Sequence, residues 1–295
     1  MGQYFSVKTM NFRVSGPDKG VLANFETSPS SLQPLLIAAL GVILATTAAA
    51  QSSRLQLVPK GRPFRLTFAD PREIKMALSF EGDSKINAMI GNYFSLFSIQ
   101  EEGRERFEMH LGLEGAGYFG LTQLDRRFPL ESSDGLIGVY LEGRSGQWQW
   151  QVRYTHISAH LADGSTDTPI AYSREHLALR GAFVSDEGLH LYGGVYSLLN
   201  TIPELAPWTL QWGMNYFWRA NLYQLTPFVG SDFKWKTEAE ANPSACIQVG
   251  LALSDLQETY RSFRFFYSYQ TGADPRGQYF MHTATSHSLG VEMQI

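Results

Sequence analysis

The stretch Trp148 to Leu161, WQWQVRYTHISAHL, alternates strictly between two kinds of side chain, and this alternation decides the fold. The even positions are aromatic or apolar before they change to histidine and serine: Trp148, Trp150, Val152, Tyr154, His156, Ser158 and His160. The odd positions begin polar: Gln149, Gln151, Arg153, Thr155, Ile157, Ala159 and Leu161. A period of two is that of a β-strand, and an aromatic face opposite a polar face predicts lipid on one side and a polar lumen on the other.

The composition excludes several classes of protein. The chain of 295 residues has 24 basic and 28 acidic side chains, a formal net charge of −4, so nucleic acid is not an expected partner. A mean hydropathy of −0.18 is too polar for a bundle of membrane helices. The single cysteine, Cys246, excludes an internal disulfide and paired-cysteine metal or redox sites. A soluble exported protein and a β-barrel remain.

The N-terminal region predicts export. An apolar run from Leu35 to Thr47 precedes three alanines, Ala48 to Ala50, which are the small residues that signal peptidase accepts. A single-span anchor is the alternative, but Gly41 and the threonines weaken a run that is already short for crossing a bilayer. We therefore predict a signal peptide at 1–50 with cleavage near Ala50, an N-terminal periplasmic segment at 51–72 and a barrel at 73–295.

Alternation and turn residues predict about twelve strands, with long and short links taking turns between them. The strands are expected near 73–80, 86–99, 104–121, 135–143, 147–161, 175–185, 189–199, 208–218, 223–236, 244–253, 261–271 and 284–295. Short turns at one end and long loops at the other are typical of outer-membrane proteins, and an even strand count fits. The predicted fold is all-β: a transmembrane, antiparallel, up-and-down outer-membrane β-barrel.

Aromatic residues are expected to form girdles at the two membrane interfaces, which a soluble two-sheet sandwich, the competing architecture, does not explain. Charged residues on the inward face, such as Arg153, Arg180, Glu108 and Lys234, predict a polar lumen. The pattern leaves open whether water or side chains fill that lumen. The last strand, SLGVEMQI, is apolar at alternate positions, as expected of a strand read by the barrel-assembly machinery, although it ends in Ile295 and not in an aromatic residue.

Five motifs together resemble a family of bacterial exported barrel proteins known as domain of unknown function 1207. They are Phe68-Ala69-Asp70-Pro71-Arg72-Glu73, the run from His156 to Asp163, Ser173-Arg174-Glu175, Leu191-Tyr192-Gly193-Gly194, and Arg276-Gly277-Gln278-Tyr279-Phe280. The resemblance spans nearly the whole mature chain. It implies the outer membrane of a Gram-negative bacterium as the location and a barrel as the fold, and it implies no activity.

The His156-Ile157-Ser158 step resembles, over a few residues, that of outer-membrane lipid A 3-O-deacylases. The resemblance implies a serine nucleophile, a histidine two residues before it and a glutamate on the next strand, all on the lipid-facing wall. Those enzymes usually have asparagine after the serine, where this chain has Ala159. Their barrels are also smaller, so the resemblance is local.

Strand pairing independently indicates a third catalytic partner. If 147–161 and 175–185 are antiparallel neighbours, His156 and Ser158 pair approximately with residues 175 to 177, which places Glu175 on their face. We therefore predict Ser158 as the nucleophile, His156 as the general base and Glu175 as the orienting carboxylate of a serine esterase. Two polar residues at the rim of a barrel without enzymatic activity are the alternative interpretation.

His160 and Asp163 follow on the same strand end and the next loop, and we expect them to contact the headgroup of lipopolysaccharide, the predicted substrate. A calcium ion is a weaker interpretation because histidine is not a ligand that calcium favours. No cofactor and no metal are predicted. Two classes of function stay open: a lipid A deacylase-like serine esterase, and a non-enzymatic barrel that acts as a narrow channel or a structural envelope protein.

Overall fold

The computed structural model describes residues 53–82, 84–101, 107–218, 225–237, 243–253 and 262–294. The predicted signal peptide, residues 1–50, lies outside these described residues. Among them, no helix has the length and apolar character needed to cross a membrane. The chain forms antiparallel strands and a short 3₁₀ turn, η2 (Gly277–Tyr279). The strands are β1 (Ser53–Leu57), β2 (Met76–Glu81), β3 (Lys85–Glu101), β4 (Phe107–Thr122), β5 (Leu130–Ser145), β6 (Trp148–Leu161), β7 (Ser173–Val184), β8 (Leu189–Ile202), β9 (Trp208–Phe217), β10 (Leu225–Lys236), β11 (Pro243–Leu253), β12 (Ser262–Ala273) and β13 (Thr283–Gln294).

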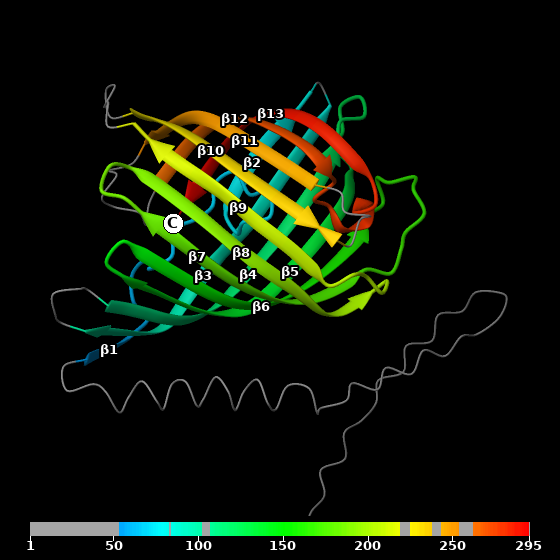
Figure 1. Ribbon diagram of the computed structural model, residues 1–295. Coiled ribbons are helices and arrows are strands. Elements are labelled where there is room, and N and C mark those ends of the chain that lie inside the picture. The colour runs from blue at the N-terminus through cyan, green and yellow to red at the C-terminus, as the bar shows by residue number, and fades with distance from the viewer. Residues whose placement is uncertain are drawn as a thin grey trace, which may run out of the picture. The chain divides into compact units, whose positions relative to one another are not determined.

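Strands β2 to β13 form a closed barrel, because each pairs with its neighbours in the chain and β13 pairs back onto β2 (Figure 1). All of these pairings are antiparallel, which confirms the predicted up-and-down barrel of twelve strands. The predicted strand bounds lie within a few residues of the observed ones for most strands, and β5 begins five residues earlier than expected, at Leu130. Closure lets every wall strand share its backbone hydrogen bonds with two neighbours.

The extra strand, β1, pairs with the same edge of β3 as β2 does. Leu57 pairs with Phe97 and Ala77 pairs with Met89, so β1 and β2 run in one direction along β3. They are the two halves of one interrupted wall strand. Between them, residues 58–75 leave the wall and enter the lumen, where they appear as the cyan loop inside the barrel (Figure 1).

We call residues 59–75 the plug. Phe64, Leu66, Thr67, Ile74 and Glu73 are each at most 5% exposed, although they belong to no strand. The N-terminal segment predicted at 51–72 thus includes β1, which pairs with β3, and most of the plug. The segment carries Arg72, Asp70 and Glu73, whose charges find partners on the inward faces of the wall strands.

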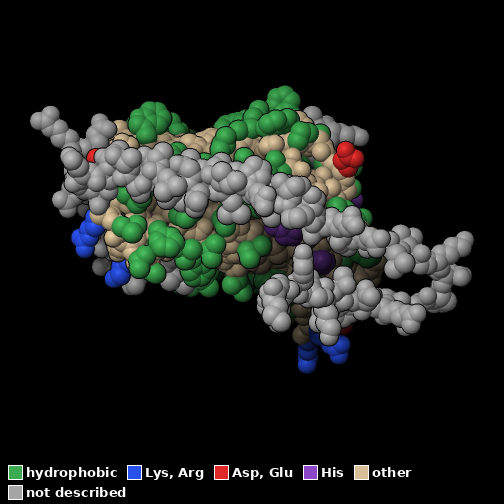
Figure 2. Space-filling model, turned by 90° about the horizontal axis from the view of Figure 1, so that it is seen from below, with side chains coloured by type: hydrophobic (Ala, Val, Ile, Leu, Met, Phe, Trp, Pro, Cys, Tyr) green, Lys and Arg blue, Asp and Glu red, His purple; other side chains and the backbone are tan. Residues whose placement is uncertain are grey.

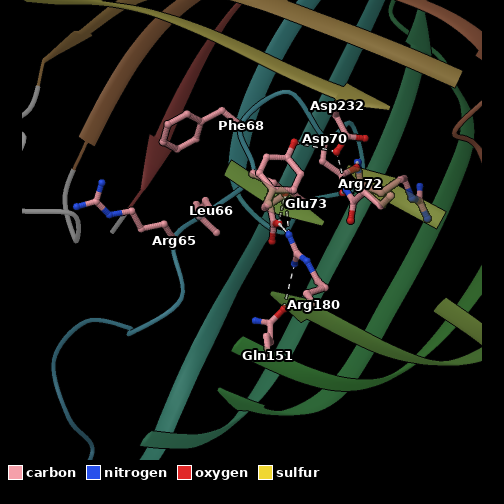
Figure 3. A network of polar contacts seen from close by, with 12 residues as sticks. Arg65, Leu66, Phe68, Asp70, Arg72, Glu73, Gln151, Arg180 and Asp232 are labelled. Atoms are coloured by element: carbon pink, nitrogen blue, oxygen red, sulfur yellow. Dashed lines mark hydrogen bonds and ion pairs between the residues drawn. The ribbon is translucent and has the colours of Figure 1, made fainter. Parts of the chain in front are cut away.

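The inner faces of the strands are polar and charged, as predicted. Arg180 on β7 lies at the centre of the lumen network, where its Nη2 atom donates to Glu73 Oε2 and Thr67 Oγ1 of the plug, both at 2.9 Å, and its Nη1 atom donates to Gln151 Oε1 at 3.0 Å (Figure 3). Lys234 pairs with Asp70, to which Gln211 Nε2 also donates at 2.9 Å. The plug thus supplies counter-charges for charged side chains on the inner wall, which are costly to bury without partners.

The outer wall is apolar. The exposed side chains include Trp148, Trp208, Trp212, Trp235, Phe94, Ile137 and Leu289, and hydrophobic side chains cover much of the visible wall in Figure 2. So many exposed large apolar side chains are unusual on a protein that is surrounded by water. A closed barrel with a charged interior and an apolar exterior is an outer-membrane protein.

The first prediction concerns Glu73, which anchors the plug. Its replacement by alanine leaves Arg180 without its buried carboxylate partner, so the free energy of unfolding should fall by about 3 kcal/mol. Denaturant unfolding in detergent micelles, followed by tryptophan fluorescence, measures the change. Glu187→Ala, at an exposed turn, is the control and should alter the free energy by less than about 0.5 kcal/mol. Equal effects would contradict the anchoring role.

The same variant should show a defined pH dependence. Burial raises the pKa of Glu73, but Arg180 and Arg153 outweigh burial and hold the pKa below its ordinary value. A carboxyl whose pKa is lowered by folding stabilises the folded state above its unfolded pKa of about 4.3, and this contribution is lost as the pH falls. The difference in unfolding free energy between wild type and Glu73→Ala should therefore be largest above about pH 5 and should shrink below about pH 4.

Candidate functional site

The candidate site lies on the outer wall of β6, near the end of that strand. Gln149, Gln151, Arg153, Thr155 and Ala159 are buried on the inward side, whereas the even-numbered side chains point outward. His156 and Ser158 therefore share the apolar outer wall with Trp148 and Tyr154, as the alternation predicted. The two side chains therefore face the surroundings of the barrel and not its lumen.

The structure brings His156 and Glu175 together across two neighbouring strands. The two residues are direct partners in the β6–β7 register. His156 Nδ1 lies 3.7 Å from Glu175 Oε1, and their side chains are 41% and 32% exposed. This distance is that of an ion pair when the imidazole is protonated, and it is longer than a normal hydrogen bond. With Nδ1 on the glutamate side, the Nε2 atom of His156 is left for another partner.

Ser158 is the next outward residue along β6. The Cα atoms of successive outward residues on a strand are roughly 6.6 Å apart. The serine and the imidazole are therefore neighbours, but this spacing does not by itself bring them into contact. Among the contacts of the described residues, no hydrogen bond joins Ser158 to His156. Ser158 pairs in register with Ser173 on β7 and with Gly135 on β5.

The sequence did not predict two neighbours of Glu175, Tyr154 and Leu199, as parts of the site. Tyr154, the outward residue before His156, lies next to Glu175 across β6 and β7, because it pairs with Leu177, the outward neighbour of Glu175 on β7. On the other side, the β7–β8 register shifts between Glu175 and His176, where Leu199 is the extra residue. A bulge of this kind re-aims the side chains next to it. The alternation placed Tyr154 on the correct face, but its position beside Glu175 depends on strand register.

His160 and Asp163, the predicted headgroup contacts, lie at the end of β6 and at the start of the loop that follows. His160 is exposed on the outer wall, and Asp163 is partly exposed. Neither side chain forms a hydrogen bond or an ion pair with the described residues. Their role in binding stays a prediction. In the part of the chain that the structure describes, no three His, Cys, Asp or Glu side chains are grouped so as to hold a metal ion.

The inner face of the same strand is firmly held. Thr155 Oγ1 donates to Glu114 on β4, and Gln278 Nε2 donates to the backbone oxygen of Ala159 at 2.6 Å. Gly277 packs so closely that a Cβ atom there would lie 2.4 Å from the Cβ atom of Ala159. The loop around η2 thus packs against the inner face of the segment that carries His156 and Ser158.

Four of the sequence motifs meet behind this segment. Asp134 on β5 accepts hydrogen bonds through the same oxygen, Oδ2, from Arg72 of the plug at 2.8 Å and from the backbone N–H of Gly277 at 2.9 Å. The guanidinium of Arg174 lies 4.8 Å from the ring centre of Phe280. The plug, the η2 loop and the ends of β6 and β7 are therefore one connected structure, which positions the outward-facing residues from within the barrel.

Comparison with known proteins gives a family and two distant structural likenesses. The chain resembles the outer membrane phospholipase A from Escherichia coli with a TM-score of 0.47 and 13% identity, over 79% of this chain and 91% of that one. It resembles OmpT, an outer membrane protein of Vibrio cholerae, with a TM-score of 0.32 and 7% identity, over 82% of this chain and 99% of that one. No curated protein matches the chain. The family model described as "Protein of unknown function (DUF1207)" matches residues 34–294, and the chain belongs to this family.

Proposed function

We propose that the protein is a serine esterase that hydrolyses an acyl ester of an outer-membrane lipid, lipopolysaccharide in particular, from the lipid-facing wall. One observation carries this proposal: His156 and Glu175 are paired across β6 and β7 with Nδ1 and Oε1 at 3.7 Å, and Ser158 is the adjacent outward residue. A hydroxyl, an imidazole and a carboxylate in this order are the components of a catalytic triad.

Each group has a defined role in the reaction. Glu175 holds Nδ1 of His156, so that Nε2 accepts the proton of Ser158 as its Oγ atom attacks the ester carbonyl carbon. The bond between that carbon and the ester oxygen then breaks, and the leaving alkoxide takes the proton from His156. Water, activated by the same imidazole, hydrolyses the acyl-enzyme and regenerates Ser158.

The distance between His156 and Glu175 is compatible with this assignment. Catalytic hydrogen bonds are often long before substrate binds and shorten in the complex, so a separation of 3.7 Å between His156 and Glu175 needs only a small adjustment. The side chains of His156 and Glu175 are partly exposed, while Gln278 holds the backbone behind them at Ala159 and Glu114 holds the side chain of Thr155. This combination favours a preorganised site.

The position along the barrel supports a lipid substrate. Ser158 and Glu175 lie near the strand ends that face the 162–172 loop, beside the exposed His160. An acyl chain along the apolar wall would bring its ester to this level, where His160 and Asp163 are available to the polar headgroup. Their imidazole and carboxylate suit the phosphates, hydroxyls and amines of lipopolysaccharide.

The plug argues against the alternative function, a narrow channel. It fills the middle of the lumen with buried side chains such as Phe64 and Ile74, and its charges are paired to the wall. We therefore expect no stable ion conductance from the purified protein in planar lipid bilayers at neutral pH. Regular single-channel steps would contradict this expectation and favour the channel.

The central experiment replaces Ser158 by alanine and compares lipid A by mass spectrometry. Cells that express the wild type should lose a hydroxyacyl chain from lipid A, and cells with equal amounts of Ser158→Ala should retain it. Loss of the nucleophile should lower the rate by a factor of about 10³ or more. Ser173→Ala, which removes the neighbouring hydroxyl on the same wall, is the matched control and should keep a substantial part of the activity.

Two results would count against the proposal. If wild-type and Ser158→Ala cells both retain the hydroxyacyl chain, the protein does not deacylate lipid A. If both yield the shortened product, another group is the nucleophile. The first result, together with absent conductance, would favour a structural barrel.

A second variant tests the orienting carboxylate. Glu175→Gln keeps the size of the side chain but removes the charge that stabilises protonated His156, so kcat should fall by a factor of about 10² to 10⁴, with a smaller effect on KM. Because Glu175 is partly exposed, the free energy of unfolding should change by less than about 1 kcal/mol. Unchanged kcat would exclude Glu175 from the triad.

A further inference from the structure

The hydroxyl of Ser158 faces a position on the wall that has no side chain. Gly135 on β5 is the direct register partner of Ser158, and it is exposed on the outer wall. A Cβ atom at Gly135 would have the Oγ atom of Ser158 as its nearest neighbour, at 3.6 Å. The serine oxygen therefore points toward the space above this glycine.

Projecting side chains border this space. The next outward residues of β5 are Ile137, which is 66% exposed and pairs with His156, and Val139, which is 46% exposed and pairs with Tyr154. On the other side of β6, Ser173 and Glu175 occupy the corresponding positions. Beside the Ser158 hydroxyl, the outer wall thus has no side chain at Gly135 and a large projecting side chain at Ile137.

The backbone does not require a glycine at this position. Gly135 is not among the glycines with a positive φ angle, which include Gly146 and Gly188. A Cβ atom would be at an ordinary contact distance from Ser158 and would meet nothing closer. Glycine within a strand weakens it, since it adds no packing and loses more conformational entropy on folding. Neither the backbone conformation nor packing therefore explains the missing side chain at Gly135.

We propose that Gly135 determines the substrate range of the site, because the gap above it admits the ester carbonyl and the first carbons of a long acyl chain. The rest of the chain then lies along Ile137 and Val139, which are apolar and exposed. A larger residue at 135 places carbon atoms where the carbonyl must approach Ser158 Oγ. This inference rests on the proposed esterase function and adds its substrate class: long-chain lipid esters, bound from the β5 side.

Gly181 on β7 offers a matched control. It is also an exposed glycine on the outer wall, with Trp150 as its register partner, six residues away from Glu175. The nearest atom to a Cβ atom there would be Gln149 O at 4.0 Å. Substitutions at Gly135 and Gly181 should therefore have similar effects on folding, and only those at Gly135 lie beside Ser158.

The test compares Gly135→Ala, Gly135→Leu, Gly181→Ala and Gly181→Leu with wild type on two substrates. Purified proteins in detergent micelles are assayed with lipopolysaccharide, by release of hydroxyacyl chains, and with p-nitrophenyl acetate, whose acyl group is small. The ratio of the two kcat/KM values should fall about tenfold in Gly135→Ala and about a hundredfold in Gly135→Leu, since small displacements of a reacting group have effects of this size. Both Gly181 variants should keep the wild-type ratio within about twofold, as expected for a site away from the chemistry.

The possible outcomes separate this inference from the function on which it rests. If wild type is active and the Gly135 variants keep the same ratio as the Gly181 variants, the role of Gly135 is overturned and the esterase stands. If wild type cleaves neither substrate, both proposals are overturned. Because the ratio compares two substrates of one preparation, a partly unfolded variant lowers both rates and leaves the ratio unchanged.

Discussion

The structure depends on the closure of one hydrogen-bonded sheet in a medium that offers no water. In lipid, an unpaired backbone N–H or C=O group is costly, so the wall must leave no open edge within the membrane. Pairing of β13 with β2 meets this requirement. The alternation of side chains then sorts the molecule into an apolar outside and a polar inside, because successive residues of each strand point to opposite faces.

The charged side chains inside the barrel need partners, and the plug supplies them. The inward charges of Arg180 and Asp134 are buried, and the Lys234 side chain is only 11% exposed. A buried charge is stable only with a partner and with its hydrogen bonds satisfied. Glu73, Asp70 and Arg72 supply those partners from a segment inserted between the two halves of the first wall strand. The insertion adds no new edge to the barrel, since β1 and β2 continue along β3 on either side of it.

The plug also connects the lumen to the candidate site. Asp134 binds both Arg72 and the η2 loop, and the η2 loop binds the backbone of β6 at Ala159. The inward half of this strand end is therefore rigid, while His156, Ser158 and Glu175 on the outward half contact the surroundings of the barrel. The backbone at Ala159 is thus held from inside the barrel, while the side chains of His156 and Glu175 remain accessible from outside.

The sequence by itself determined the strands, their faces and most of their ends, since each strand repeats with a period of two and this signal is local. It also placed Glu175 on the face of His156 and Ser158, although the expected pairing with residues 175 to 177 lies about two residues from the observed register, in which Glu175 is opposite His156. The run from Phe68 to Glu73 was identified as a motif but not as a plug, because it has no periodicity and its partners, such as Arg180 and Asp134, are far away in the chain. Only the tertiary structure decided that this segment fills the lumen, that Asp134 links it to the η2 loop, and that Gly135 lies beside Ser158. Each of these depends on which strands lie next to each other and in what register, and so on contacts between residues that no local pattern connects.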